Sequence, residues 1–165
     1  MTTIDRAAPT RRVYFHDPLA PAASLVVPSV FVAVRWHHGT LLLVRRRDSG
    51  AWELPGGRVD VGETAVEAAV RETAEEAGVR VEVTELAGLF TDPGHVVRSA
   101  DGEVRQQFTL LFRARCLGGV PHGDQHETSD AAWVPVADLA GLAMEPPVRI
   151  WVAQAIAVGE PPLLR

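Results

Sequence analysis

The stretch GRVDVGETAVEAAVRETAEEAGV, residues 57–79, decides how the rest of the sequence is interpreted. Thr64 followed three residues later by Glu67 is a capping box, which marks the start of a helix. Gly78 stands where a helix end favours left-handed backbone geometry, which glycine adopts without strain. The pattern therefore predicts a helix over residues 65–77, held between two glycine-containing loops.

This helix has an acidic side near its C-terminal end. Glu72, Glu75 and Glu76 fall within an arc of roughly 100° on a helical wheel, because spacings of three and four residues bring side chains together. The helix dipole is negative at this end, so a purely structural helix would gain from Lys or Arg here. A bound divalent cation reverses that penalty, and Mg²⁺ prefers oxygen ligands. The alternative is a solvated acidic face with Arg71 as a local ion-pair partner. The opposite side of the wheel is the predicted core face, made of Val66, Ala69, Val70, Thr73 and Ala77.

The same stretch resembles the Nudix box. That pattern is Gly, five residues, Glu, seven residues, Arg-Glu, an aliphatic residue, one residue, Glu-Glu, one residue, Gly and an aliphatic residue, and Thr73 replaces the first aliphatic residue. Residues 52–56 and 132–135 also look like that family, so the resemblance extends loosely over residues 24–158. It implies an α+β fold, an α/β/α sandwich with a mixed β-sheet in which the box forms a loop–helix–loop.

The resemblance implies a hydrolase of the MutT-like or ADP-ribose pyrophosphatase-like kind. Such an enzyme uses Mg²⁺, or Mn²⁺, to cleave the diphosphate linkage of a nucleoside diphosphate joined to another group. ADP-ribose-like compounds, nucleotide sugars and (d)NTPs all stay open as the small nucleotide substrate. The alternative is a catalytically weak nucleotide sensor or regulatory binding module, which the intact glutamates at 72, 75 and 76 argue against.

The resemblance also implies roles for individual residues. The ions would be held by Glu72, Glu75, Glu76 and the carbonyl of Gly56, while Arg71 would orient the glutamates. Glu63 resembles a position that braces the box. The general base stays open between Glu72 and a carboxylate of the loop 118–130, where Glu127 and Asp130 are the candidates.

Substrate contacts are predicted from charge and strand alternation. Arg105 and Gln107 lie two residues apart on an expected strand, so both side chains can face a cleft while Gln106 faces away. Within the run Arg45-Arg46-Arg47, at least one arginine is expected only to flank a strand end, and His95 is expected to be solvated in its loop. The predicted substrate contacts are Arg45, Glu53, Arg105 and Gln107.

Composition limits the class of protein. The chain has 165 residues, 47% of them apolar and 22% charged, which is typical of one soluble globular domain. It contains no apolar run of membrane-spanning length, and its net charge of −5 argues against a nucleic-acid polymer as partner. The lone Cys116 cannot form an internal disulfide, so a cytoplasmic location and a buried thiol are expected.

The remaining elements follow from hydrophobic pattern and turn signals. Residues 1–22 are expected to be an arm that could include a short strand or promote a homodimer, and residues 23–160 to be the Nudix domain. Residues 24–35 and 40–45 are predicted to form a hairpin. Further strands are expected at 80–90, 106–116 and 131–134, and a last helix at 147–158.

Overall fold

The computed structural model describes residues 10–165, apart from the side chain of His38. The helices are α1 (Ala65–Ala77) and α2 (Pro146–Ile156), with short 3₁₀ turns at His37–Gly39 and Val136–Gly141. The strands are β1 (Arg12–Phe15), β2 (Leu25–Trp36), β3 (Thr40–Arg46), β4 (Trp52–Glu53), β5 (Gly56–Arg58), β6 (Val79–Phe90), β7 (His95–Arg98), β8 (Val104–Gly119), β9 (Thr128–Pro135) and β10 (Leu163–Leu164).

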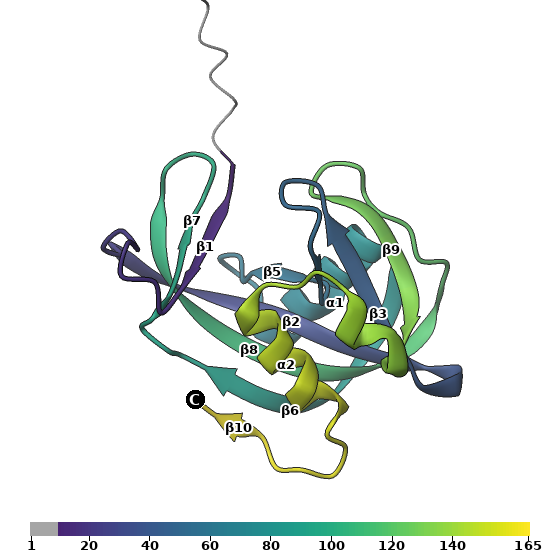
Figure 1. Ribbon diagram of the computed structural model, residues 1–165. Helices are drawn as coiled ribbons and strands as arrows, with labels where there is room; N and C mark the ends of the chain where they lie inside the picture. Colours follow the sequence, from purple (N-terminus) through teal and green to yellow (C-terminus); the bar gives the residue numbers. More distant parts are fainter. Residues whose placement is uncertain (1–9) are drawn as a thin grey trace, which may run out of the picture.

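The sheet is mixed and lies between the two helices. Strand β2 runs parallel to β8, from the pair Leu25↔Arg105 to the pair Arg35↔Arg115, and β10 runs parallel to β6. The strand order along the main path is β1-β7-β8-β2-β3-β4, and all pairs other than β2–β8 and β6–β10 are antiparallel, including β5 with β2, β6 with β8 and β9 with β3. One apolar cluster packs α1 against the sheet and a second packs α2 against it (Figure 1). The predicted α+β sandwich is therefore confirmed.

Helix α1 begins and ends where the sequence predicts. The Thr64 hydroxyl accepts a hydrogen bond from the Glu67 amide, and the Glu67 carboxylate accepts one from the Thr64 amide. Gly78 closes the helix with φ of 68°, in the left-handed region. These two local devices satisfy backbone groups that a helix leaves unpaired at its ends, so the helix boundaries need no tertiary contact.

The predicted core face of α1 is confirmed for Ala69, Thr73 and Ala77, which are fully buried, and is wrong for Val66 and Val70. Val66 and Val70 remain 47% and 37% exposed, whereas Glu76 is only 3% exposed. The helix buries its small side chains because they allow a close approach to the sheet, and Glu76 turns inward to accept a hydrogen bond from the Gly56 amide at 2.9 Å. Thr73, the departure from the box pattern, is fully buried and donates its hydroxyl to the Ala69 carbonyl at 2.7 Å.

The other predicted strands are confirmed within a few residues, but their pairing differs. Only two residue pairs join β2 to β3. Strand β3 makes its longer pairing with β9. Strand β2 instead pairs with β8 along most of its length. The two strands lie some eighty positions apart in the sequence, so no local pattern predicts this pairing.

Both ends of the chain contribute to the sheet. Strand β1 pairs antiparallel with β7, so residues 12–15 of the predicted arm belong to the folded body, and residues 1–9 lie outside the described residues. Strand β10 pairs with β6 beyond residue 160, where the predicted domain ended.

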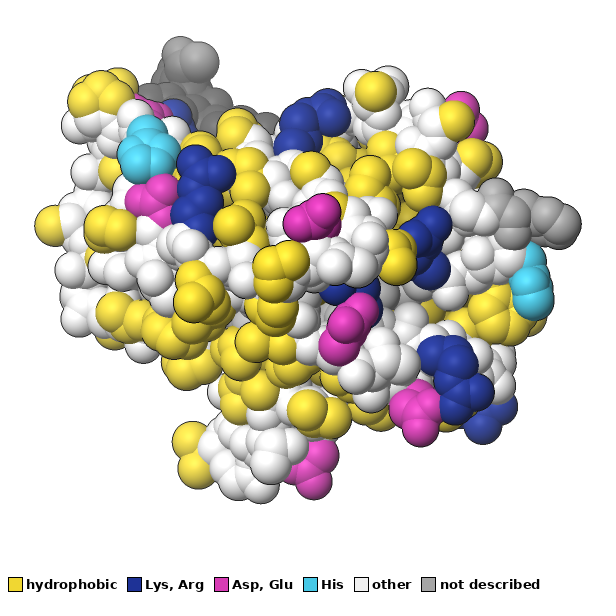
Figure 2. All heavy atoms as spheres, turned by 90° about the horizontal axis from the view of Figure 1, so that it is seen from below, with side chains coloured by type: hydrophobic (Ala, Val, Ile, Leu, Met, Phe, Trp, Pro, Cys, Tyr) yellow, Lys and Arg dark blue, Asp and Glu magenta, His cyan; other side chains and the backbone are white. Residues whose placement is uncertain are grey.

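The face of the molecule shown in Figure 2 carries scattered charges of both signs. On the face seen in Figure 2, apolar side chains gather near the middle, with basic and acidic groups interspersed among them. In the described part of the chain, no helix is both long and apolar enough to cross a membrane. Cys116 is buried in the apolar cluster beneath α1, as predicted.

His95 is buried rather than solvated, which gives a pH-dependent stability. Its ring contacts Phe15 and Trp151 at centroid distances of 5.8 and 5.7 Å. Burial lowers the pKa of His95 to about 4; repulsion from Arg11 and Arg105 adds to this, and attraction from Asp92 opposes it.

We therefore expect acid to weaken the fold through this residue. The unfolded histidine, with a pKa near 6.5, binds a proton that the folded state excludes, so stability present above pH 6.5 is lost as the pH falls toward 4. The full loss is about 3 kcal/mol in the free energy of unfolding. Urea unfolding at several pH values should show this loss in the natural protein and in an exposed control, His126→Gln, but not in His95→Phe. Equal acid slopes in all three proteins would contradict it.

Candidate active site

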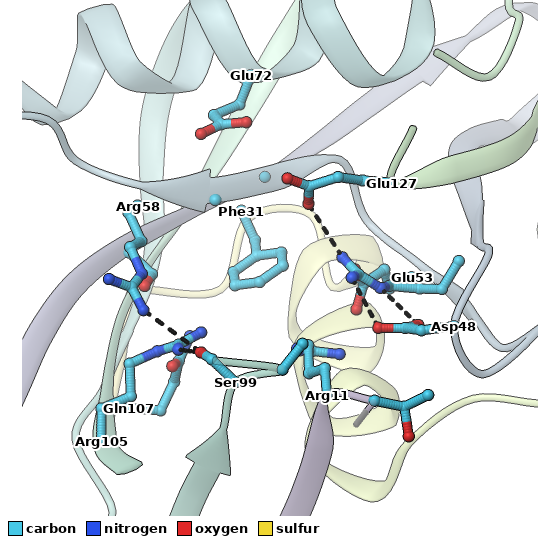
Figure 3. Close-up of a pocket in the computed structure, with 16 residues that line it drawn as sticks. Arg11, Phe31, Asp48, Glu53, Arg58, Glu72, Ser99, Arg105, Gln107 and Glu127 are labelled. Carbon is cyan, nitrogen blue, oxygen red and sulfur yellow. Dashed lines mark hydrogen bonds and ion pairs between the residues drawn. The ribbon is translucent and has the colours of Figure 1, made fainter. Parts of the chain in front are cut away.

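A cavity of about 520 Å³, lined by many charged side chains, opens beside strands β2, β5 and β8 (Figure 3). Strands β2, β5 and β8 supply its walls, α1 contributes one glutamate, and the segments around residues 10, 48, 100 and 127 form its rim. The lining residues are Thr10, Arg11, Ser29, Phe31, Arg46, Asp48, Glu53, Gly56, Gly57, Arg58, Glu72, Ser99, Ala100, Arg105, Gln107 and Glu127.

One end of this cavity is acidic. Glu72 reaches it from α1 and lies against Gly57, where an added Cβ would come within 2.4 Å of a Glu72 carboxylate oxygen. Glu76, one turn further along α1, lies beneath it on the Gly56 amide. The absence of a side chain at Gly57 therefore allows β5 to approach the Glu72 carboxylate closely.

Burial and mutual repulsion disfavour the charged form of the carboxylates at this end of the cavity. Burial raises the pKa of Glu76 well above its usual value, and repulsion from Glu53 and Glu72 adds to the effect. Burial likewise raises the pKa of Glu72, with further repulsion from Glu75 and Glu127 against attraction from Arg71. A cation placed here would reverse these unfavourable terms.

The donor chemistry fits Mg²⁺ of the kind that binds together with substrate. Within residues 10–165, no three His, Cys, Asp or Glu side chains are arranged as a ready-made metal site. Mg²⁺ often binds through one or two carboxylates and completes its octahedral shell with water and substrate phosphates. Glu72 and Glu76 supply hard oxygen ligands of that type beside the glycine loop.

Arg71 organises the carboxylates from the outer side of α1. Its guanidinium pairs with Glu63 at 2.6 Å, Glu72 at 3.0 Å and Glu75 at 3.1 Å, and it also donates to the Arg58 carbonyl at 3.1 Å. The hydrogen bond from Arg71 lowers the pKa of Glu63 to about 2. One side chain thus ties the loop before α1 to two of the helix glutamates.

Arg46 forms a second ion-pair network on the opposite wall. It pairs with Asp48 at 2.9 Å, with Glu53 at 3.2 Å and with Glu127 at 3.7 Å. Burial by itself would lower the pKa of Arg46, but the hydrogen bond and charge of Asp48 and the charge of Glu53 more than offset it, so the pKa is raised. The arginine stays charged and holds Glu127 at the cavity rim.

The structure brings together most, but not all, of the predicted site residues. Glu53, Gly56, Glu72, Arg105, Gln107 and Glu127 line the cavity, and Glu76 lies directly beneath it. Arg71 does not line the cavity and pairs with Glu63, Glu72 and Glu75, and three further predicted residues also lie outside the cavity. The Glu75 side chain is 60% exposed and pairs with Arg71. Arg45 is exposed and donates to the Gly50 carbonyl. Asp130, on β9, lies opposite Arg45 in the strand pairing.

Several cavity residues were missed by reasoning from sequence. Arg46 lines the cavity instead of Arg45, because neighbouring residues of β3 point to opposite faces of the sheet. Phe31 and Ser29 face the cavity from β2, and Ser99 reaches it from the turn after β7. No local pattern identifies them, since their common position depends on long-range pairing.

The floor of the cavity contains polar atoms without partners. Gln107 is 3% exposed and its Oε1 has no hydrogen-bond partner among the described residues, and the same holds for Nε of Arg105, which is 8% exposed. Buried polar groups of this kind are normally satisfied by protein, water or ligand. The floor therefore offers a ligand one unpaired acceptor, on Gln107, and one unpaired donor, on Arg105.

Comparison with known proteins gives a consistent result. The family model for the NUDIX domain matches residues 26–156. A MutT-like protein of Streptomyces ambofaciens is 36% identical over 124 residues, which cover 74% of this chain and 73% of that protein. An ADP-ribose pyrophosphatase of Methanocaldococcus jannaschii is 42% identical over 114 residues, covering 64% of this chain and 60% of that protein.

Solved structures agree on the fold. The crystal structure of an ADP-ribose pyrophosphatase from Streptococcus suis superposes with a TM-score of 0.67, at 21% identity, over 84% of this chain and 98% of that one. At this level of identity the likeness concerns the fold alone.

Proposed function

The chain belongs to the Nudix family and is a Nudix hydrolase, and from that premise we propose that it cleaves the diphosphate linkage of a nucleoside diphosphate joined to another group, with Mg²⁺ or Mn²⁺ as cofactor. The observation that carries the proposal is the position of Glu72 at the acidic end of a cavity of about 520 Å³, with Glu76 bonded to the amide of the lining residue Gly56. A cavity of that volume falls in the range of ligand pockets. The names of the relatives, MutT-like protein and ADP-ribose pyrophosphatase, support small nucleotide substrates.

Each protein group has a distinct role in this proposal. Glu72 and Glu76 would hold the metal ion, and Arg71 is a positioning residue that keeps Glu72 in place. When bound, Mg²⁺ neutralises phosphate charge and lowers the pKa of a coordinated water. Glu127 lines the facing wall, with Arg46 3.7 Å from its carboxylate, and would accept the proton of the attacking water.

The closing experiment is a substrate panel. ADP-ribose, NADH, a nucleotide sugar and several (d)NTPs are incubated with MgCl₂, and the products are separated by chromatography. We expect at least one compound to yield a nucleoside monophosphate, with turnover lost in EDTA and restored by Mg²⁺ or Mn²⁺. Turnover that persists in EDTA would contradict the metal role.

The alternative, a nucleotide sensor, gives a different outcome. Tight binding of a nucleotide without hydrolysis across the whole panel would favour it. The buried and desolvated Glu76 argues for the enzyme, because a sensor without a metal ion would gain stability by losing that charge.

A further inference from the structure

The end of the cavity opposite the glutamates is basic. Arg58 reaches it from β5, Arg105 from β8 and Arg11 from the segment before β1. Figure 3 shows Glu72 and Glu127 on one side of the Phe31 ring, and Arg58 and Arg105 on the other. The cavity therefore has two poles of opposite charge.

Strand register shows how the two poles are spaced. Arg58 lies two residues from Gly56 along β5, which is about 7 Å. Arg105 starts further away on β8, six residues from Leu111, the residue opposite Phe31, and its guanidinium reaches the same Ser99 hydroxyl as that of Arg58. A ligand that meets both poles must therefore be larger than a single phosphate group.

Arg58 and Arg105 are held together rather than dispersed. Both donate to the Ser99 hydroxyl, Arg105 at 2.5 Å and Arg58 at 3.5 Å. Glu103 forms a close ion pair with Arg58 and lies 3.6 Å from Arg105. The positions of both guanidinium groups are thus fixed before any ligand arrives, which reduces the entropy lost on binding.

The charges that act on Arg105 are net positive. Burial lowers the pKa of Arg105 to about 10, and repulsion from Arg58 and Arg11 outweighs the attraction of Glu103 and Asp101. Nε of Arg105 is buried without a partner among the described residues, and the Arg11 charge also attracts Asp48, another lining residue. An anion at this pole would supply the missing acceptors and charge.

We propose that this arginine pole, formed by Arg11, Arg58 and Arg105, binds a second phosphate group of the substrate, a phosphomonoester on the nucleoside portion that is not cleaved. The proposal rests on the proposed function, since it places the diphosphate at the glutamate pole. A phosphomonoester carries close to two negative charges and three acceptor oxygens, which suits several guanidinium groups better than a single carboxylate does. The preferred substrate is then a nucleoside diphosphate compound that carries a 2′- or 3′-phosphate.

A binding measurement tests this without catalysis. Titration calorimetry in EDTA compares AMP with adenosine 2′,5′-bisphosphate and adenosine 3′,5′-bisphosphate, so the two arms distinguish the position of the extra phosphate. We expect one bisphosphate to bind about tenfold to a hundredfold more tightly than AMP, since hydrogen bonds to charged groups are strong. Equal affinities, or no binding of either bisphosphate, would overturn the proposal.

A kinetic measurement then separates the two proposals. The ratio of kcat/KM for NADPH to that for NADH should exceed ten if the 2′-phosphate is read, and the ratio for coenzyme A to dephospho-coenzyme A should do so if the 3′-phosphate is read. Arg105→Gln, and independently Arg58→Gln on a more exposed side chain, should bring the high ratio toward one. Arg12→Gln is the matched control, because Arg12 lies over the Tyr14 ring outside the cavity.

The two failures look different. Hydrolysis of both members of each pair at equal kcat/KM overturns the arginine pole and leaves the hydrolase proposal standing. Absence of hydrolysis throughout the panel, together with tight binding of a bisphosphate in EDTA, overturns the proposed reaction and leaves the arginine pole standing.

Discussion

Glu76→Gln should lower metal-dependent turnover on the order of 10³-fold while leaving the fold intact. The neutral amide removes a charge that binds the ion, and an ion that stabilises several kcal/mol of transition-state charge is worth about this factor. Its oxygen can still accept the hydrogen bond from Gly56. Because the natural carboxylate is buried close to the charge of Glu53, the metal-free variant should unfold at the same temperature or higher.

Two companion variants make this result specific. Glu82→Gln removes an exposed carboxylate paired with Arg115, far from the cavity, and should change neither turnover nor Mn²⁺ affinity. Glu127→Gln should keep Mn²⁺ affinity while kcat falls about 10²-fold or more, since it removes a base rather than an ion ligand. Calorimetric titration with Mn²⁺ alongside steady-state kinetics distinguishes the three variants. If Glu76→Gln turned over substrate as fast as the natural protein, Glu76 would not be a ligand of the catalytic metal ion.

Gly57→Ala should reduce kcat about 10²-fold without unfolding the protein. An added Cβ would lie 2.4 Å from Glu72 Oε1 and 2.6 Å from its Cδ, so the carboxylate must move. These atoms are the far end of a flexible side chain, so the fold can adjust, but misplacing a catalytic group by about 1 Å can cost this much rate. Circular dichroism melts and kinetics on the same preparation check both parts.

The matched control is Gly141→Ala, because nothing lies within 4 Å of a Cβ placed there. Gly56→Ala sets the other limit, since its Cβ would meet the Val30 carbonyl at 2.1 Å and the backbone itself would have to shift. If Gly57→Ala and Gly141→Ala turned over substrate at the same rate, the close packing of Glu72 on β5 would have no catalytic importance.

The features that could be predicted from sequence are those set by residues close together in the chain. The limits of α1 follow from the Thr64–Glu67 capping box and from Gly78, which act within one helical turn. The common face of Arg105 and Gln107 follows from strand alternation, and both line the cavity. Patterns that repeat over a few residues therefore gave correct placements.

The errors came from features that depend on distant parts of the chain. Arg46, rather than Arg45, lines the cavity, because adjacent residues of β3 face opposite sides and pairing with other strands decides which side meets the cavity. Burial of Glu76 and exposure of Val66 contradict ordinary hydrophobicity, because the helix is oriented by the Gly56 amide as well as by apolar contact. A functional site is where such violations are expected.

The parallel pairing of β2 with β8 also has a consequence for how the protein is made. Leu25 can pair with Arg105 only after the ribosome has added the eighty residues that lead to Arg105. At a translation rate of roughly 5–20 residues per second, the delay is about 4 to 16 s. During that time β8 has not yet been made, so the apolar strand β2 lacks its main partner. We expect ribosome-associated chaperones to bind this segment. Slower translation between the two strands should then lower the yield of active enzyme.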